Sequence, residues 1–133
     1  MAASSYITPF SVLIRDLGLT STGGEVVNIN REQLFDLIRQ LLVCVHVDEA
    51  WYKASYPDVE TAIRSGAFRN AKEHFVANGY FEGRLPAKIN VDEGFYTKRY
   101  PDVAERIEDG EVASAQEHFE AHGFVEGRLP FEL

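Results

Sequence analysis

Apolar residues recur at helical spacing along most of the chain, and one arrangement of apolar and polar positions occurs twice. The first copy spans residues 47–86, and the second spans residues 91–130. Matching positions are 44 residues apart without a gap, as Pro57 and Pro101 show. Such a self-match indicates two copies of one supersecondary unit. The pattern predicts an all-α protein in which an N-terminal segment, residues 1–46, precedes two three-helix repeats packed as one compact domain.

The N-terminal segment contains one strongly amphipathic stretch, residues 30–45. Asn30 and Gln33 have the spacing of a capping box, which predicts a helix start. The apolar stripe of this helix is so broad that it must be buried, either within the chain as a cap on the repeats or against a second copy of the chain. The residues that define this cap or dimer face are Leu34, Leu37 and Leu41.

The residues before this helix carry weaker signals. Thr8 and Pro9 are typical of a helix start, and Gly18 is typical of a helix end. A short strand over residues 6–14 is the competing interpretation. Residues 25–29 have the composition of a brief extended segment, although a lone strand has little to pair with.

Each copy is expected to form three short helices. In the first copy, Asp48 stands at the N-cap position of the first helix. Tyr56 ends that helix, because the residue before a proline is disfavoured in helical conformation, and Pro57 then begins the second helix. The third helix is expected over residues 69–78. The matching positions of the second copy are Asp92, Tyr100, Pro101 and residues 114–122.

Glycines punctuate each copy. Glycine adopts the left-handed backbone conformation at little cost, so it is the usual residue at helix ends and in tight turns. We expect glycines to end the second helix (Gly66, Gly110), to form a left-handed cap on the third (Gly79, Gly123), and to take a positive φ angle in the closing Glu-Gly-Arg-Leu-Pro turn (Gly83, Gly127).

The order of motifs in each copy is Tyr-Pro-Asp-Val, then Glu-His-Phe, then Glu-Gly-Arg-Leu-Pro. This order resembles a short repeat of many bacterial proteins, found beside glycosyltransferase domains of surface-polysaccharide pathways and in large secreted calcium-binding repeat proteins. The resemblance covers both copies and leaves residues 1–46 outside. The chain departs from the pattern by having tyrosine where asparagine often precedes the proline, and by carrying no catalytic domain. The resemblance implies an accessory or interaction module without enzymatic activity and leaves its ligand open.

An aspartate follows the proline in both copies, and an arginine recurs in both closing turns. We expect Asp58 and Asp102 to favour the start of the second helix and to pair with Arg84 and Arg128. Calcium binding is the functional alternative for the aspartates. Calcium needs six or more oxygen ligands, and neither copy contains a dense loop of Asp, Asn and Gly.

Histidines recur at His74 and His118, and a hydrogen bond to a neighbouring turn is their expected role. A metal site or general-base catalysis is the alternative, and it depends on how the copies pack. The chain has no HExxH sequence, Gly-rich phosphate loop or Ser-His-Asp order. Its single cysteine, Cys44, excludes an intrachain disulfide and a Cys-based metal site.

Aromatic residues recur at the first helix of each copy. Core packing explains most of them, and any that are exposed would suit a sugar ring or a partner helix. The exposure of the tryptophan distinguishes these roles. With the two histidines, the candidate interaction or ligand surface consists of Trp51, Tyr52, Phe95, Tyr96, His74 and His118.

The 133 residues carry a formal net charge of −8. This charge argues against non-specific nucleic-acid binding and against docking on anionic lipid, because both need clustered Lys and Arg. No apolar run approaches the roughly 20 residues needed to cross a bilayer, and the N-terminus lacks the pattern of a secretory signal. The expected location is cytoplasmic, with export that needs no signal left open.

The sequence therefore predicts a non-catalytic protein-interaction or scaffolding module that needs no cofactor. A protein partner is expected, such as a glycosyltransferase or an export component of a bacterial surface-polysaccharide pathway. The alternatives are a carbohydrate- or calcium-binding module and, less favoured, an enzyme that uses His74 and His118. Self-association into a homo-oligomer is compatible with each of these functions.

Overall fold

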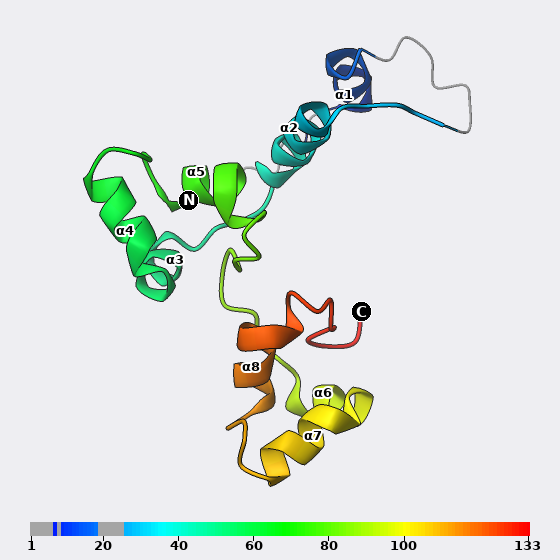
Figure 1. Cartoon of the computed structure of the whole chain (residues 1–133), viewed down its shortest axis with the longest axis vertical. Coiled ribbons are helices and arrows are strands. Elements are labelled where there is room, and N and C mark those ends of the chain that lie inside the picture. The colour runs from blue at the N-terminus through cyan, green and yellow to red at the C-terminus, as the bar shows by residue number, and fades with distance from the viewer. Residues whose placement is uncertain (1–6, 8, 19–25) are drawn as a thin grey trace. The chain divides into compact units, whose positions relative to one another are not determined.

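The hydrophobic pattern corresponds to helices throughout the part of the chain that is described. A computed structural model (Figure 1) describes residues 7, 9–18 and 26–133. The described residues form helices and contain no strand, which confirms the predicted all-α class. The chain divides into two units, residues 1–78 and 79–133. The packing of the two copies as one domain stays a prediction.

The first unit begins with helix α1, Phe10–Asp16. Pro9 immediately precedes the helix, and Gly18 ends it with a φ angle of 70°. The competing strand over residues 6–14 is therefore wrong for the residues that form α1. Thr8 lies outside the described residues.

Helix α2, Arg31–Leu42, starts at the predicted capping box. Asn30 Oδ1 accepts a hydrogen bond from Gln33 N at 2.9 Å, and Gln33 Oε1 accepts one from Asn30 N at 3.0 Å. The helix ends three residues before the predicted end, because residues 43–45 continue as a turn. Residues 26–29 of the predicted extended segment form neither helix nor strand.

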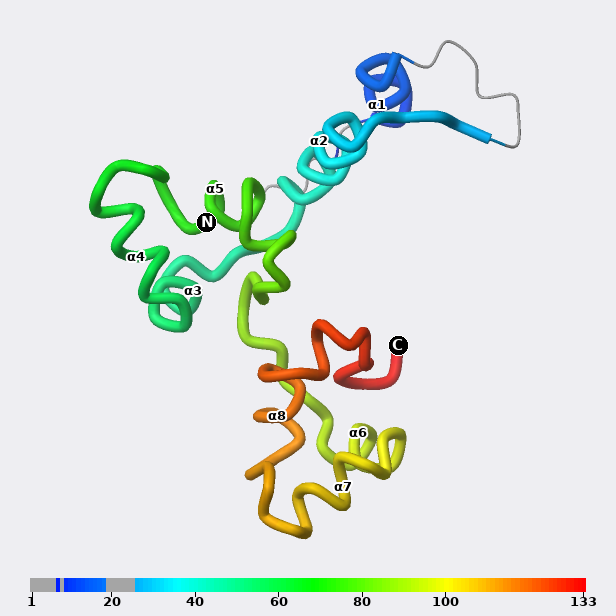
Figure 2. The backbone as a smooth tube through the Cα atoms, in the orientation of Figure 1, coloured from blue at the N-terminus to red at the C-terminus, as the bar shows by residue number. Residues whose placement is uncertain are grey.

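The helices of the two copies have matching bounds, shifted by the same 44 residues as the sequence. In each copy the third helix contacts the first and the second, and Figure 2 shows the tube folding back in this way. The elements of the first copy are α3 (Glu49–Ser55), α4 (Pro57–Arg64), α5 (Ala71–His74) and the π-helical turn η1 (Phe75–Gly79); those of the second are α6 (Glu93–Arg99), α7 (Pro101–Glu108), α8 (Ala115–His118) and η2 (Phe119–Gly123).

The predicted starts of the first and second helices and the break between them are confirmed, whereas the third helix of the first copy begins at Ala71, two residues after its predicted start. Asp48 Oδ1 accepts a hydrogen bond from Trp51 N at 3.0 Å, and Asp92 caps α6 in the same way. Tyr56 has φ and ψ angles of −127° and 81°, outside the helical region, and Pro57 occupies the first turn of α4. The clash between proline and the preceding residue therefore separates the first and second helices, as the sequence indicates.

The glycines after the third helices differ from the prediction. Gly79 and Gly123 do not take positive φ angles, whereas Gly83 and Gly127 do, at 76° and 75°. A Cβ atom at Gly123 would collide with the hydroxyl oxygen of Tyr96. Gly123 is therefore needed for close packing, and the prediction of a left-handed cap at Gly79 and Gly123 is wrong.

The core of each copy forms where its three helices meet. In the first copy, Tyr52, Val59, Ala71 and Phe75 are buried. The ring of Tyr52 packs edge-on against the ring of Phe75 at a centroid distance of 6.1 Å. The matching core of the second copy consists of Tyr96, Val103, Ala115 and Phe119.

The second unit includes the closing turn of the first copy. A Cβ atom at Gly83 would lie 2.8 Å from Val125 Cγ1, so within this unit the closing turn of the first copy contacts the residue that precedes the closing turn of the second. In the same unit, Asp92 N donates a hydrogen bond to Pro130 O at 2.9 Å, which joins the start of the second copy to its end. The division between the units thus lies inside the first copy and not at the linker.

Candidate functional site

Four of the six residues predicted for an interaction surface are buried. Tyr52 and Tyr96 have no exposed surface, and His74 and His118 are 5% and 1% exposed. In each copy the tyrosine hydroxyl and the histidine Nδ1 form a hydrogen bond of 3.0 Å. The prediction that these residues belong to a surface is wrong, because the same side chains fill the core. A structural hydrogen bond is the role that the geometry supports for the histidines.

The surroundings of His118 shift its protonation equilibrium. Burial, followed by the nearby charge of Arg128, lowers the pKa of His118, and burial raises the pKa of Tyr96. Both side chains are therefore neutral near pH 7. No group of three or more His, Cys, Asp or Glu side chains among the described residues could hold a metal ion. The alternatives of a metal site and of histidine catalysis thus gain no support from the geometry.

The recurring aspartate and arginine fasten the closing turn of the second copy. Arg128 Nη1 and Nη2 donate to the two carboxylate oxygens of Asp102, both at 2.9 Å, and Arg128 Nε pairs with Glu126 at 2.7 Å. The guanidinium also lies over the ring of Tyr100, 4.9 Å from its centroid. The hydrogen bonds from Arg128 lower the pKa of Asp102. The predicted pair is therefore observed in the second copy.

In the first copy, Arg84 Nε pairs with Glu82 at 2.6 Å. The pair predicted between Asp58 and Arg84 stays a prediction. The recurring Arg, Asp, Tyr and His side chains of the second copy are thus engaged in holding its own helices and turn together. The side chains that remain for a binding surface are those that are exposed or that differ between the copies.

Trp51 and Phe95, the remaining two predicted surface residues, are half-buried. The Trp51 ring packs edge-on against Tyr56 at a centroid distance of 6.2 Å. Phe95 lines a surface pocket of about 380 Å³ together with Lys98, Arg99 and Glu132. This pocket combines an aromatic ring with two cations.

The apolar stripe of α2 is only partly covered. Leu34 and Leu41 are each 40% exposed, and Leu37 is half-buried. Burial of the whole stripe within the chain, one of the two predicted alternatives, is therefore wrong for Leu34 and Leu41, and burial against a second copy stays a prediction. These two leucines lie seven residues apart and so share one face of the helix. Other large apolar side chains of the first unit that are exposed are Ile7, Phe10, Val26, Val27 and Val43.

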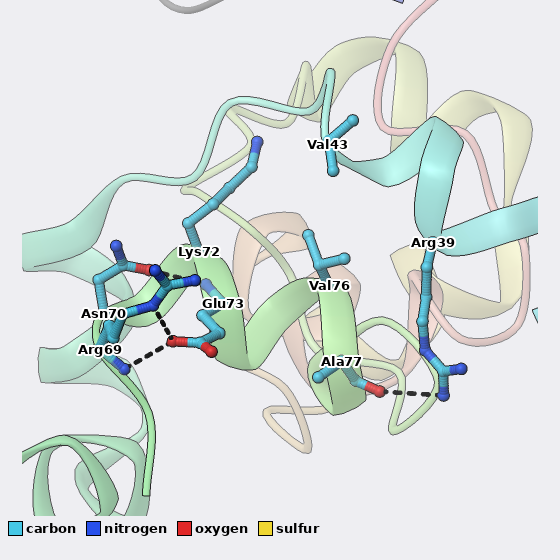
Figure 3. Close-up of a pocket in the computed structure, with 8 residues that line it drawn as sticks. All are labelled: Arg39, Val43, Arg69, Asn70, Lys72, Glu73, Val76 and Ala77. Atoms are coloured by element: carbon cyan, nitrogen blue, oxygen red, sulfur yellow. Dashed lines mark hydrogen bonds and ion pairs between the residues drawn. The ribbon is translucent and has the colours of Figure 1, made fainter. Parts of the chain in front are cut away.

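A second pocket lies in the first unit, where the end of α2 approaches the third helix of the first copy (Figure 3). Its volume is about 350 Å³. Figure 3 shows the side chain of Val43, just after α2, facing that of Val76 in η1, with Lys72 to one side and Arg39 to the other. The lining residues are Arg39, Val43, Arg69, Asn70, Lys72, Glu73, Val76 and Ala77.

The wall formed by α5 is held by polar contacts at its first turn. Asn70 caps the helix by accepting a hydrogen bond from Glu73 N at 2.8 Å. The carboxylate of Glu49 accepts hydrogen bonds from Ala71 N at 2.7 Å and from Lys72 N at 3.1 Å. These contacts satisfy the amides that a helix start leaves without intrahelical partners, and they fix α5 against α3.

Three cationic side chains line the pocket, each in a different setting. The Lys72 ammonium group donates to Val45 O, and its burial lowers the pKa of Lys72. Arg39 pairs with Asp36 at 3.1 Å and also donates to Ala77 O at 3.5 Å. Arg69 pairs through Nε with Glu73 at 3.1 Å, and its side chain is 88% exposed.

Our reading of the sequence missed this pocket, although a comparison of the two copies carries a signal for it. Position 69 is arginine in the first copy and alanine (Ala113) in the second, and Lys72 matches Gln116. Val76 matches Glu120. Buried positions of the same helix are identical in the two copies, as in Ala71 and Ala115, His74 and His118, and Phe75 and Phe119.

No helix in the described ranges combines the length and the apolar character that a membrane crossing requires. Comparisons of the chain with protein-family models, with curated proteins and with solved structures found no match. The resemblance to the bacterial repeat thus rests on the motif residues themselves, and the function must be argued from the geometry of this chain.

Proposed function

We propose that this chain is a non-catalytic protein-interaction or scaffolding module. The observation that carries the proposal is the apolar face of α2, where Leu34 and Leu41 remain exposed. The motif residues that suggested chemistry, Tyr96 and His118 among them, are used in the core. The module therefore acts through a surface and not through a catalytic centre.

The α2 face suits a partner helix or an apolar groove. Side chains one heptad apart are the positions that meet a partner when two helices pack along their length. Covering the exposed part of Leu34 and Leu41 would contribute about 1 kcal/mol for each side chain. The partner we propose is another protein, with a second copy of this chain as the alternative occupant.

The resemblance of both copies to the short bacterial repeat supports a more specific setting for this module. We place the module in the cytoplasm, beside a glycosyltransferase or an export component of a bacterial surface-polysaccharide pathway. This setting rests on the motif residues of the two copies and is part of the proposal.

The test uses the whole tagged chain and a double variant, Leu34→Ser with Leu41→Ser. We expect the wild type to capture a stoichiometric protein from the source organism, as read by mass spectrometry, and the variant to lose it. Light scattering on the same preparations reports self-association. Val125→Ser, which removes an exposed apolar side chain from the second unit, is the control. Capture of the same partner by all three proteins would refute the role of the α2 face.

A second candidate function is carbohydrate binding, and the pocket at Phe95 favours it. The ring of Phe95 would stack on a sugar, and Lys98 and Arg99 would pair with the carboxylate of an acidic sugar, with Glu132 as the one acidic side chain of the lining. Titration calorimetry with uronic-acid oligosaccharides would test this function. Heat of binding that is lost in Phe95→Ala would support it, and no heat with the wild type would exclude it for these sugars.

A further inference from the structure

The pocket of Figure 3 has a chemical character of its own within this acidic chain. The chain carries a formal net charge of −8, yet the pocket is lined by Arg39, Arg69 and Lys72 and by one carboxylate, that of Glu73, which pairs with Arg69. Outside the lining, Asp36 pairs with Arg39 and Glu49 lies near Lys72. The lining itself has more cations than carboxylates, which favours an anionic ligand over a cationic one.

This cationic character belongs to the first copy alone. Moving from the first copy to the second replaces Arg69 by alanine, Lys72 by glutamine and Val76 by glutamate. Arg69 lies directly before the N-cap residue of the third helix, Lys72 lies in α5 and Val76 lies in η1, and all three line the pocket. The buried face of that helix is the same in both copies. The buried core of the repeat therefore does not depend on these three side chains, which line the pocket beside α2.

The glutamine of the second copy shows that the fold of this region needs no charge at position 72. Gln116 Nε2 donates to Ile89 O at 2.7 Å, and Lys72 makes the matching contact to Val45 O in the first copy. Both side chains tie the segment before the first helix to the third helix. A neutral amide is sufficient for this hydrogen bond. The ammonium group of Lys72 therefore adds a positive charge to the pocket that the hydrogen bond does not require.

The apolar part of the pocket limits the kind of anion. The side chains of Val43 and Val76 face each other at the pocket, and Ala77 adds a further apolar group. A volume of about 350 Å³ is near the lower end for ligand sites, and accommodates one or two side chains. A small inorganic anion would leave the valines without a contact. The lining suits a ligand that carries a carboxylate and an apolar group close together.

We infer that this pocket binds an acidic peptide segment of a partner protein, with an apolar side chain seated between Val43 and Val76 and a carboxylate paired with Arg69 and Lys72. This inference deepens the proposed function and rests on it. A guanidinium group can receive a carboxylate through two parallel hydrogen bonds, and Arg69 is exposed enough to do so. Leu34 and Leu41 lie on a different side of α2 from Arg39, so the α2 face would contact a different part of the partner.

The test is a selection from a displayed random-peptide library against the whole immobilised chain. The selected peptides are expected to be rich in Asp and Glu with one apolar residue, and their affinities are then measured by fluorescence anisotropy. The pocket variant is Arg69→Ala with Lys72→Gln, which installs the residues of the second copy. Loss of two charge-assisted contacts should weaken binding at least about tenfold. Val76→Glu, which also copies the second repeat, should weaken it by a similar factor.

The chain offers a matched control for the change in net charge. Lys88→Ala with Arg106→Ala removes two cations from the second unit, and the second change installs the residue that the first copy has at that position, Ala62. We expect this control to change the affinity less than about twofold. An equal loss of binding in the control and in the pocket variant would show non-specific attraction and overturn the inference. Selected peptides without acidic residues would also overturn it.

Failure of this inference can be told apart from failure of the proposed function. If the pocket variants capture the native partner as well as the wild type does, while Leu34→Ser with Leu41→Ser loses it, the pocket inference fails and the interaction module stands. If crosslinking through the pocket yields only a second copy of this chain, the occupant is not a partner protein and the inference fails as well.

Discussion

Replacing Gly123 with alanine should destabilise the second unit, although the same change inside a helix ordinarily stabilises a protein. Gly123 ends η2 with a φ angle outside the left-handed region, so alanine would gain about 0.5–1 kcal/mol of helix propensity. Against this gain, the new Cβ atom would collide with the Tyr96 hydroxyl and lie 3.3 Å from the Phe119 ring. The sign of the effect depends on which of these terms is larger.

The packing terms are the larger ones. Tyr96 is fully buried, and forcing an extra methyl group into a close-packed core costs about 1–3 kcal/mol. Displacing the hydroxyl also breaks its hydrogen bond with His118, and a buried polar group left without a partner costs about 1–3 kcal/mol. After the helix gain is subtracted, the net loss is about 3 kcal/mol. In a domain of this size such a loss lowers the melting temperature by roughly 15 °C.

Urea unfolding followed by circular dichroism measures this loss, and a double variant identifies its cause. Tyr96→Phe removes the oxygen with which the Cβ atom collides, so Gly123→Ala should cost less in a protein that already carries Tyr96→Phe than in the wild type. Gly123→Asn should be worse than alanine, whereas a left-handed cap would tolerate asparagine. A Gly123→Ala protein as stable as the wild type would refute the close-packing argument.

Three further predictions concern the caps, the ion pair and the buried histidine. Asp102→Asn should cost roughly 0.5–1 kcal/mol, because its bidentate pair with Arg128 is partly exposed, and urea midpoints should show a smaller loss at high salt. Lowering the pH from about 7 to about 5 should reduce stability, because the folded pKa of His118 lies below its unfolded value near 6.5, so the unfolded chain binds the proton first. Urea midpoints across this range should fall with pH, and His118→Gln should reduce the slope. Asn30→Ala should cost about 1 kcal/mol and speed amide exchange in α2; unchanged exchange would contradict the capping box.

Local signals were sufficient to predict where most helices begin and end. A cap such as Asn30 or Asp48 acts on amides two or three residues away, and proline acts on the residue directly before it. The predicted starts of α2, α3 and α4 therefore agree with the structure. The same holds for the positive φ angle at Gly127, because a tight turn of a few residues requires it.

The predictions that failed depended on contacts between residues far apart in the chain. The sequence does not distinguish a glycine needed for a left-handed backbone from one needed for close approach, and Gly123 meets a tyrosine from another helix. The stripe of α2 was wide enough to predict burial, but how much of Leu34 is covered depends on packing. The pocket beside Lys72 required that α2 and η1 be brought together, which no local pattern specifies.

The hydrogen bond between Asp92 N and Pro130 O bears on how such a segment can be duplicated or inserted during evolution. It places the two ends of the second copy next to each other, so the copy closes on itself. A segment whose ends meet can be inserted into a surface loop of another protein, or copied in tandem, without stretching the host backbone. The second copy thus has the geometry of a segment that can be inserted or duplicated as a unit. Duplication of such a segment yields two matching sequences joined by a short linker.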